Sequence, residues 1–350
     1  MASPHFRPVP HARPGERIAV LSPAFAAPTI SVEVHEQALR RLEELTGLIP
    51  VEYPTTRAGG ASARERARDV NAAFADPGIR AVIATLGGDD QVTVVPHLDA
   101  SVIAADPKPF LGYSDNTNLH SFLWRLGVRS FYGGSTQVHL GPGPAVDEIH
   151  ARSLRAALLH GGDIELTEPG ESEDFGRNWT DPRALSEFGT RERTDPWDWA
   201  GPARVVSGPT WGGCIEVLDQ VALADRMPPV AELRGSILLL ETSETLPGAD
   251  EVRRWVRGLG ERGVLEAVSG VLVARPVVAE MGVPLAPAAV RARLRAAQRD
   301  AIVEQVARYN PEAVVCVGVP FGHTRPQWII PHGGIMRLDG ATRSVTASYD

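Results

Sequence analysis

The sequence is poor in several residue types, and each shortage excludes a class of protein. Its 350 residues include only two cysteines, Cys214 and Cys316, which are too few for the disulfide framework of a small secreted domain. The apolar runs fall far short of the ~18 residues that a membrane span needs, so we expect no membrane partner. Residues 1–15 contain proline, histidine and arginine but no apolar segment of a secretory signal. They predict an irregular arm and a cytoplasmic protein.

Lysine is nearly absent as well, since Lys108 is the only one, and the formal net charge is -8. A negative protein repels phosphate backbones, so nucleic-acid binding would need a local basic stripe. The densest basic cluster, residues 291–299, has no aromatic residue among its arginines. We therefore expect no nucleic-acid partner. The hydrophobic fraction of 43% and the charged fraction of 22% are near the averages for globular chains and exclude a disordered one.

Strand and helix patterns alternate along the first part of the chain. Apolar runs typical of strands cover residues 17–22, 49–53, 81–86 and 109–113. Helical patterns cover residues 31–45, 61–75, 92–98 and 115–126. Continuous apolar strands joined by helices are typical of a parallel sheet that is buried on both faces. We predict an α/β fold, with an N-terminal parallel-sheet domain over residues 16–165.

The composition changes after this domain. Residues 166–204 are rich in charged residues, proline and glycine, and they include Trp179, Trp197 and Trp199. These indoles either pack the segment onto a domain or line a site at the domain junction. From residue 205 to 350, short apolar runs (215–218, 236–240, 270–274, 313–317 and 335–338) alternate with helices near residues 250–259 and 287–309. They predict a second, smaller and β-rich mixed α/β domain.

The most informative junction is FLGYSDNT, residues 110–117, where a strand ends and a helix begins with Ser114 between them. A serine at such a turn has the geometry of a nucleophile elbow. The backbone N–H of Asp115 and the helix N-terminus would then face an oxyanion on a bound carbonyl. The segment lacks the second glycine of the α/β-hydrolase elbow. Ser114 could equally be a helix cap, since serine caps helices well.

A nucleophilic serine needs a base, and the base needs an orienting group. His323 lies in a loop bracketed by glycine and proline that follows an apolar run, where catalytic groups are often placed, although it could be a solvated loop residue. Glu241 follows four apolar residues, so its carboxylate requires a partner, either an imidazole or a helix cap or arginine. The remaining candidates carry less information: His97, His120, His139, His150 and His160.

Five segments together resemble the LD-carboxypeptidase family of serine peptidases, which includes the microcin C immunity proteins. They are GGDD (87–90) with PHLD (96–99), KPFLGYSDNTNLH (108–120), WGG (211–213), LLLETSE (238–244) and FGHTRPQ (321–327). The resemblance spans the chain from about residue 17 to 338. It implies an N-terminal flavodoxin-like or class I amidotransferase-like α/β domain, a smaller C-terminal domain, and a site in the cleft between them.

The resemblance also implies the chemistry of the site. Ser114, Glu241 and His323 correspond to a Ser-Glu-His triad, and the backbone amides of Gly88 and Asp115 correspond to an oxyanion hole. Members of the family are commonly homodimers, and their chemistry needs no cofactor. Asp89 and Asp90 have no further ligand at metal-binding spacing, so we expect no metal.

Two branches of the family compete as the closer match. The segment GGDD and the Trp-rich loop favour the immunity branch, which cleaves an acyl link in a peptidyl- or aminoacyl-nucleotide, because an indole stacks well on a nucleobase. Gly87 and the indoles of Trp179 and Trp211 are the expected substrate contacts, with packing of the loop as the alternative for the indoles. The other branch removes the terminal D-alanine from a murein tetrapeptide in cell-wall recycling. A protein that only sequesters ligand would not need all three triad residues.

Two departures from the family pattern concern specificity. Cys214 stands where the family often has an asparagine, so it is a candidate substrate contact of altered chemistry. Thr245 stands where some immunity proteins have a lysine that helps to hold an acidic group. An acidic aminoacyl group is therefore not implied.

Overall fold

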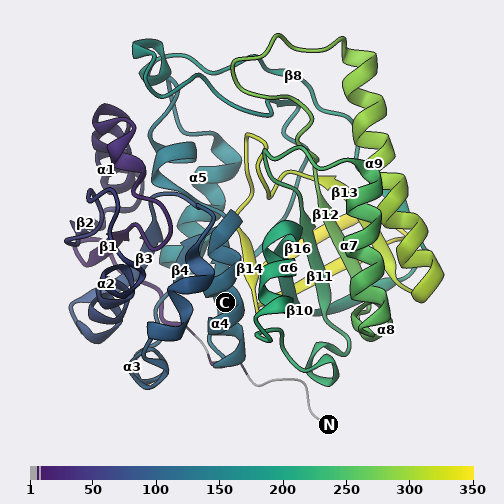
Figure 1. Ribbon diagram of the computed structural model, residues 1–350, viewed down its shortest axis with the longest axis horizontal. Coiled ribbons are helices and arrows are strands. Elements are labelled where there is room, and N and C mark those ends of the chain that lie inside the picture. The colour runs from purple at the N-terminus through teal and green to yellow at the C-terminus, as the bar shows by residue number, and fades with distance from the viewer. Residues whose placement is uncertain (1–5, 8) are drawn as a thin grey trace.

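The protein consists of two β-sheets that lie side by side, each with its own helices. The computed structural model describes residues 6–7 and 9–350, so residues 1–5 and 8 of the predicted arm lie outside the described chain. The N-terminal half and the C-terminal half occupy opposite sides of the molecule, as the purple-to-blue and green-to-yellow ribbons of Figure 1 show. The predicted α/β class is confirmed.

The first sheet has the order β14-β5-β4-β3-β1-β2. Its first five strands in chain order are parallel, and they are β1 (Arg17–Leu21), β2 (Ile49–Glu52), β3 (Ile79–Ala84), β4 (Phe110–Gly112) and β5 (Ser130–Tyr132). The apolar runs predict the first four of these strands but not β5. The sixth, β14 (Ile330–His332), comes from the C-terminal part of the chain and pairs antiparallel with β5. A late segment therefore completes the N-terminal sheet.

The helices of this half begin and end at residues that suit those positions. Ser31 caps α1 (Val32–Thr46) by accepting a hydrogen bond from Val34 N–H, and Gly47 ends it with a φ of 69°. Ser62 and Glu65 form a capping box at the start of α2. The other helices of this half are α2 (Ala63–Ala75), α3 (Ala100–Ala105), α4 (Thr117–Arg125) and α5 (Glu148–Arg155).

The second sheet has the order β6-β16-β15-β10-β11-β12-β13-β9. Strands β10 (Val205–Cys214), β11 (Ile237–Glu241), β12 (Gly270–Ala274) and β13 (Val314–Val319) are parallel. Antiparallel strands extend both edges: β15 (Ile335–Asp339), β16 (Ser344–Ser348) and β6 (Asp163–Glu165) on one side, and β9 (Asp198–Ala200) on the other. A short pair, β7 (Glu171–Ser172) with β8 (Glu192–Arg193), stands apart.

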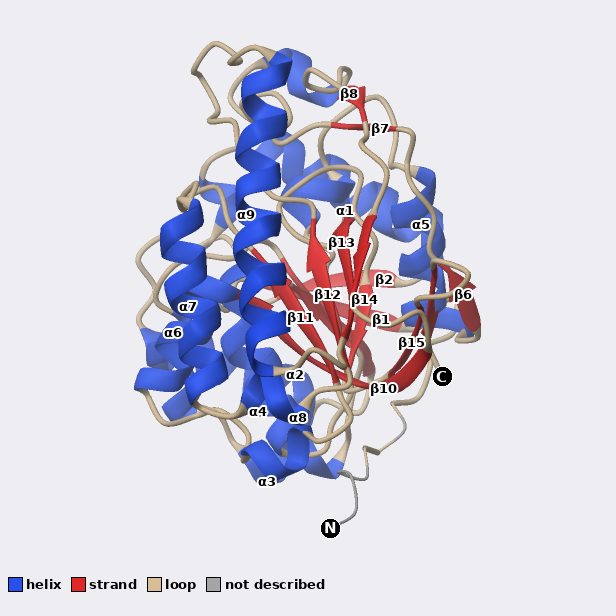
Figure 2. Ribbon diagram, turned by 90° about the vertical axis from the view of Figure 1, so that its right-hand side faces the viewer, coloured by secondary structure: helices blue, strands red, loops and turns tan. Residues whose placement is uncertain are grey.

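Helices α6 (Ile215–Leu223), α7 (Ala249–Glu261), α8 (Val264–Ala267) and α9 (Ala288–Tyr309) belong to this half. Helices α6, α7 and α9 cover one face of the second sheet (Figure 2). Alternate residues of β11 face opposite ways: Leu238 and Leu240 pack under these helices, whereas Ile237 and Leu239 belong to a core that also contains Ile18 of the first sheet. The two sheets therefore share one continuous apolar core.

Several local predictions differ from the structure. The apolar run 215–218 lies in α6 and is not a strand, because the buried side of a helix can carry the same short run as a buried strand. Residues 92–98 form two short 3-10 turns in place of a regular helix. Strand β6 lies within residues 16–165 yet pairs with β16, and β9 lies within residues 166–204 yet pairs with β13. The two halves therefore exchange segments across the boundaries drawn from composition.

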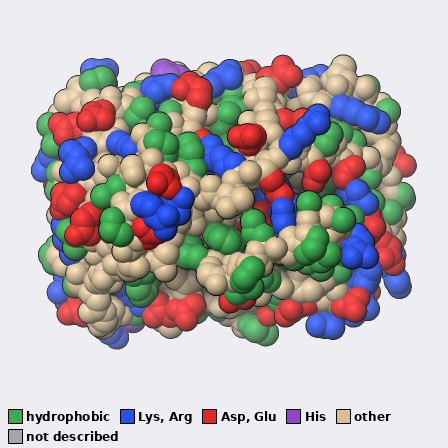
Figure 3. Space-filling view, turned by 90° about the horizontal axis from the view of Figure 1, so that it is seen from above, with side chains coloured by type: hydrophobic (Ala, Val, Ile, Leu, Met, Phe, Trp, Pro, Cys, Tyr) green, Lys and Arg blue, Asp and Glu red, His purple; other side chains and the backbone are tan. Residues whose placement is uncertain are grey.

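Among the residues that the structure describes, no helix is long and apolar enough to cross a lipid bilayer. Basic and acidic side chains are interspersed over the face of the molecule seen in Figure 3. The arginines of α9 follow the same pattern: Arg291 and Arg295 pair with Glu192, and Arg299 pairs with Asp198. The basic cluster predicted from sequence is thus largely neutralised by neighbouring carboxylates.

Candidate active site

The candidate residues meet where parallel strands of both sheets end. Ser114 follows β4, and Gly87 and Gly88 follow the neighbouring β3. Glu241 is the last residue of β11, and His323 follows β13. The carboxyl ends of parallel strands are the usual place for a ligand site in open α/β sheets. The shared core brings these two edges together between the halves.

Ser114 has the backbone conformation of an elbow. Its φ is 62°, in the left-handed region that costs a residue with a Cβ about 1–2 kcal/mol. Two hydrogen bonds hold this turn: Ser114 N–H donates to Tyr132 Oη over 3.1 Å, and Thr117 Oγ1 donates to the Ser114 carbonyl over 2.7 Å. A 3-10 turn and then α4 follow directly. Such strain persists only where surrounding contacts fix it, which favours the nucleophile over a simple helix cap.

The two glycines lie against this turn. A Cβ added to Gly87 would come within 2.9 Å of Ser114 Oγ and 3.3 Å of Asp115 N, so a larger residue would displace the serine. Gly88 packs on Phe25, and the Gly87 carbonyl accepts a hydrogen bond from the Phe25 N–H over 3.1 Å. Gly87 therefore lies directly against the serine, in space that a side chain would fill, whereas Gly88 packs on Ala24 and Phe25.

The Asp115 side chain points away from the serine. Its carboxylate accepts hydrogen bonds from Gln91 N–H over 2.9 Å and from Asn118 Nδ2 over 3.0 Å. Burial raises the pKa of this carboxyl to about 6, and these hydrogen bonds oppose the shift. The Asp115 carboxyl is thus occupied by these local contacts. The group of Asp115 that lies near Ser114 is its backbone N–H.

Glu241 and His323 form a buried pair. The Nδ1 atom of His323 lies 2.6 Å from Glu241 Oε2, and Tyr132 Oη donates to the other carboxylate oxygen over 2.6 Å. Gly322 makes room for this arrangement, because a Cβ there would lie 2.7 Å from Glu241 Oε2. Tyr132 therefore links the carboxylate to the elbow, since the same hydroxyl accepts the Ser114 N–H.

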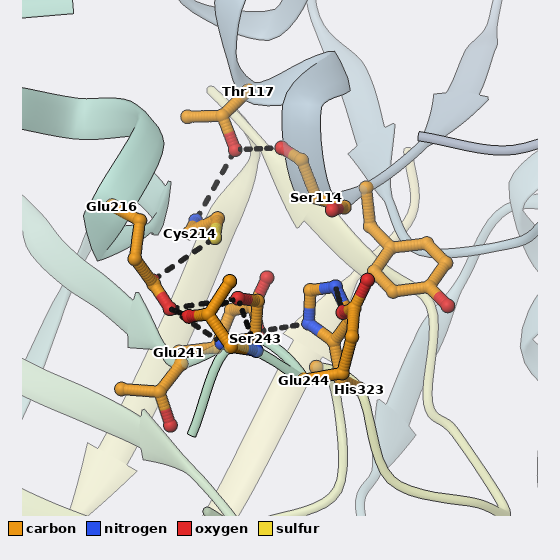
Figure 4. Close-up of polar contacts among 12 residues, drawn as sticks. Ser114, Thr117, Cys214, Glu216, Glu241, Ser243, Glu244 and His323 are labelled. Atoms are coloured by element: carbon orange, nitrogen blue, oxygen red, sulfur yellow. Dashed lines mark hydrogen bonds and ion pairs between the residues drawn. The ribbon is translucent and has the colours of Figure 1, made fainter. Parts of the chain in front are cut away.

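The second imidazole nitrogen faces another carboxylate. His323 Nε2 lies 3.1 Å from Glu244 Oε2, and Figure 4 shows the ring between Glu241 and Glu244. Burial disfavours the imidazolium, but the charges of Glu241 and Glu244 outweigh it and raise the pKa of His323 to about 9. No hydrogen bond joins Ser114 to His323 in the described chain, although both line the same cavity. Catalytic hydrogen bonds are often absent before substrate binds.

That cavity has a volume of about 300 Å³ and lies directly over the elbow. Its walls include Gly87, Gly88, Ser114 and His323. Aromatic, apolar and charged residues form the rest of the walls: Phe25, Leu86, Tyr113, Val138, Asp174, Phe175, Gly176, Trp179, Glu244, Met281 and Arg325. A mainly apolar cleft with a few convergent polar groups is typical of a small-molecule site.

The predicted substrate contacts separate into two groups. Gly87 and Trp179 line the cavity. Trp211 does not, because β10 directs its indole into the core under the helices, where it is fully buried. Cys214 is also buried outside the cavity lining, and its thiol donates to Glu216. The structure therefore contradicts Trp211 and the Cys214 side chain as substrate contacts.

The remaining tryptophans of the loop pack against the protein. Trp197 and Trp199 are partly buried against the shared core, and Trp199 lies in the edge strand β9. Of the two readings left open by the sequence, packing holds for these two indoles, whereas Trp179 reaches the cavity.

Sequence reasoning missed several wall residues. Glu244 and Arg325 stand inside the segments LLLETSE and FGHTRPQ, so their positions next to Glu241 and His323 were a usable signal. Phe25 and Met281 come from loops without any motif. Nothing in their local sequence indicates that they reach the cavity.

The other histidines have structural surroundings. His120 is buried between Ser130 Oγ and the Gly112 carbonyl, and burial lowers its pKa to about 4. His139 and His150 stack on each other with ring centroids 4.8 Å apart.

Asp90, one of the two acidic residues considered as a metal ligand, forms a bidentate ion pair with Arg66. The described residues contain no cluster of three or more His, Cys, Asp or Glu side chains that could hold a metal ion.

Family models match both halves of the chain. The LD-carboxypeptidase N-terminal domain matches residues 18–133, and the LD-carboxypeptidase C-terminal domain matches residues 207–338. The chain belongs to the LD-carboxypeptidase family. It is therefore a serine peptidase, as the five segments indicated.

Curated relatives come from both branches of the family. A Vibrio cholerae protein, assigned provisionally to the carboxypeptidases by its name, is 26% identical over 94% of both chains. The microcin C7 self-immunity protein MccF of Escherichia coli is 29% identical over 51% of this chain and 52% of its own. The murein tetrapeptide carboxypeptidase of Pseudomonas aeruginosa is 34% identical over 43% of this chain and 51% of its own.

Solved structures show the same fold. MccF in complex with glutamyl sulfamoyl guanosine superposes with a TM-score of 0.82 over 97% of this chain and 98% of that one, at 21% identity. An active-site mutant of MccF, in which a serine, an asparagine and a lysine are replaced by alanine, superposes with a TM-score of 0.80 over 97% and 98% of the two chains, at 22% identity. The two-domain α/β architecture is thereby confirmed.

Proposed function

We propose that Ser114, His323 and Glu241 form a catalytic triad that hydrolyses an acyl link in a peptidyl- or aminoacyl-nucleotide, as in microcin-type self-immunity. The observation that carries this proposal is the common cavity. It is lined by a serine held at a φ of 62° and by a histidine whose Nδ1 lies 2.6 Å from a buried glutamate. This is the arrangement of nucleophile, base and orienting group that acyl transfer needs.

In this mechanism, His323 Nε2 takes the proton of Ser114 Oγ as the oxygen attacks the substrate carbonyl. Glu241 holds the proton on Nδ1 and stabilises the imidazolium. The N–H groups of Gly88 and Asp115 stabilise the oxyanion of the tetrahedral intermediate, and each such donor contributes about 3–4 kcal/mol in serine hydrolases. His323 then gives its proton to the leaving amine, and water hydrolyses the acyl-enzyme.

Trp179 and Phe175 support a nucleotide as part of the substrate. Both line the cavity beside the polar groups, and aromatic faces stack on nucleobases with little sequence selectivity. The related MccF is known in complex with aminoacyl sulfamoyl nucleosides. These observations favour the immunity-type substrate over a bare peptide.

The aminoacyl group of the substrate is not implied to be acidic. Glu216 contacts Cys214 and Thr245, the two positions that depart from the family pattern of an asparagine and, in some immunity proteins, a lysine. It accepts hydrogen bonds from Ser243 Oγ over 2.8 Å and Thr245 Oγ1 over 3.1 Å, and from the Cys214 thiol (Figure 4). Glu216, Cys214 and Thr245 all lie outside the cavity lining, so neither departing position offers a polar or cationic side chain that would hold an acidic group.

The second candidate is a murein tetrapeptide LD-carboxypeptidase, favoured by the 34% identity to the Pseudomonas aeruginosa enzyme over 163 residues. One experiment separates the two. The protein is incubated with a muropeptide tetrapeptide and with an aminoacyl-sulfamoyl adenosine, and products are identified by mass spectrometry. We expect cleavage of the nucleoside substrate, and release of D-alanine alone would refute the immunity-type proposal.

The triad itself is tested by Ser114→Ala, with Ser121→Ala as the matched control. Ser121 lies on α4, two turns from the elbow, and its buried hydroxyl is outside the cavity lining. We expect Ser114→Ala to abolish turnover and covalent labelling by a fluorophosphonate, whereas Ser121→Ala retains both. Normal turnover by Ser114→Ala would exclude the triad.

A further inference from the structure

We propose that Arg325 is a specificity-determining residue that binds an oxyanion group of the substrate inside the cavity. The group is a carboxylate of a peptide or a sulfamoyl or phosphoryl group of a nucleotide, because these share the oxygen atoms that a guanidinium binds. This inference rests on the proposed hydrolase function, and it assigns the recognition of charge to a residue outside the triad.

The guanidinium of Arg325 is buried without adequate partners. Its side chain is only 4% exposed, and Nε lies 3.5 Å from Glu173 Oε1, which leaves Nε without a hydrogen bond. Neither terminal nitrogen donates to any residue of the described chain. A guanidinium has five N–H donors, and leaving them unused in a buried place is costly. Since Arg325 lines the cavity, a ligand is the partner that these donors can reach.

Most neighbouring charged side chains have close partners, although both oxygens of the buried Glu173 carboxylate lack a hydrogen bond. Arg191 binds Asp147 through two hydrogen bonds of 2.7 and 2.9 Å. Asp174, which also lines the cavity, is held by Arg275 and Arg295. Among the described residues of the cavity wall, Arg325 is the only arginine or lysine. Beside the imidazolium of His323, its guanidinium is therefore the cation of the cavity wall that a bound anion can reach.

The chain makes room for this guanidinium at Gly176. A Cβ at Gly176 would collide with Nη1 of Arg325, so glycine there allows the side chain to lie along the cavity wall. Thr245, where some relatives have a lysine, is outside the cavity lining and donates to Glu216. The cation of this pocket therefore comes from the loop after β13, two residues beyond His323.

The test uses two matched pairs of substrates. One pair is a tetrapeptide with a free C-terminal carboxylate and the same peptide as its amide. The other is an aminoacyl-sulfamoyl adenosine and the corresponding amide of 5′-amino-5′-deoxyadenosine, which lacks the sulfonyl oxygens. For the pair whose anion binds Arg325, we expect wild-type KM to be roughly 10- to 100-fold lower for the charged member. The pair that discriminates identifies the source of the anion.

Arg325→Gln should abolish this discrimination by raising KM for the charged member alone, and Arg325→Lys should keep part of it. Arg191→Gln is the matched control, because it removes a charge from the same cluster but lies outside the cavity lining. It should change both members of a pair equally. Equal losses for the charged and the neutral member in Arg325→Gln would overturn the proposal.

Failure of the proposed hydrolase function can be distinguished from failure of the proposed role of Arg325. If wild-type protein neither turns over these substrates nor labels at Ser114, the hydrolase assignment fails. Calorimetric binding of the charged and neutral members to wild-type protein and Arg325→Gln then still decides the role of Arg325. Equal affinities in the two proteins refute it, and a selective loss of the charged ligand supports it.

Discussion

The carboxylate of Glu244 lies 3.1 Å from His323 Nε2, the nitrogen that would accept the proton of Ser114. Glu244 is 75% exposed at the mouth of the cavity, whereas Glu241 on the other side of the ring is buried. The imidazole is thus held between one buried and one exposed carboxylate. In the proposed mechanism, substrate displaces Glu244 from Nε2 before His323 acts as a base.

The pH dependence of activity should reflect this arrangement. A general base must be unprotonated, and the pKa of His323 is raised to about 9, so kcat/KM should increase with pH and level off above 9. Glu244→Gln removes one of the charges that raise this pKa, so the profile should move to lower pH. Each unit of that shift raises the rate at pH 7 about tenfold. Glu251→Gln, an exposed change on α7, is the control and should leave the profile unchanged.

Glu241→Gln should lower kcat by about 10⁴-fold, because the loss of the orienting carboxylate in a serine triad has that effect. Tyr132→Phe removes a hydrogen bond to the same carboxylate and the acceptor of the Ser114 N–H, but it leaves the carboxylate beside the imidazole, so it should cost much less. Steady-state kinetics of the two variants compare these losses. A loss in Tyr132→Phe as large as in Glu241→Gln would indicate that the elbow, and not the imidazole, depends on this contact.

Ser114→Gly should stabilise the protein while abolishing turnover. Glycine adopts a φ of 62° without the cost that a Cβ imposes, which is about 1–2 kcal/mol. Ser114→Ala keeps that cost and serves as the comparison. Urea unfolding of both variants measures the difference, and equal stabilities would show that the turn is not strained.

The two tryptophans should respond in opposite ways. Trp179→Ala removes an aromatic face of the cavity, so KM for a nucleoside substrate should rise by roughly 5- to 100-fold with little change in stability. Trp211→Ala empties a core position and should cost about 3–5 kcal/mol of unfolding free energy. Thermal unfolding and KM of both variants distinguish a wall residue from a core residue.

Lys108 should matter for stability alone. Its buried ammonium donates to the carbonyls of Ala73, Phe74 and Asp76 at the C-terminal end of α2. Lys108→Met leaves three carbonyls without this donor, so unfolding free energy should fall by about 1–3 kcal/mol or more. The kcat of the folded variant should remain normal. A reduced kcat at full stability would contradict this structural role.

The elbow could be predicted from sequence because its determinants are local. A buried strand, one serine and a helix follow each other within residues 110–117, and the structure retains that order. Gly87 and Gly88 likewise follow a strand end, and Gly87 lies against the serine in the structure. The meeting of Ser114 with His323 required the family resemblance, because no local pattern relates positions 209 residues apart.

The sequence-based predictions that proved wrong concern features that tertiary packing determines. The apolar run 215–218 fits a buried strand or a buried helix equally well, and its position under β11 selects the helix. Trp211 carries no sign of whether its indole faces the cavity or the core, since that depends on the register of β10 against β11. That the Arg325 guanidinium lacks hydrogen-bond partners also follows only from the folded positions of its neighbours.

Strand β14 joins the two halves in a way that affects how the enzyme can move. Seven residues after His323, the chain enters the N-terminal sheet and pairs with β5, which ends at Tyr132. The loop with the imidazole is therefore tethered at one end by β13 and at the other by the opposite sheet. A wide hinge opening would have to break these pairings, so access for substrate must depend on small rearrangements of the cavity rim. Because of the same crossing, we expect both halves to unfold in one cooperative transition.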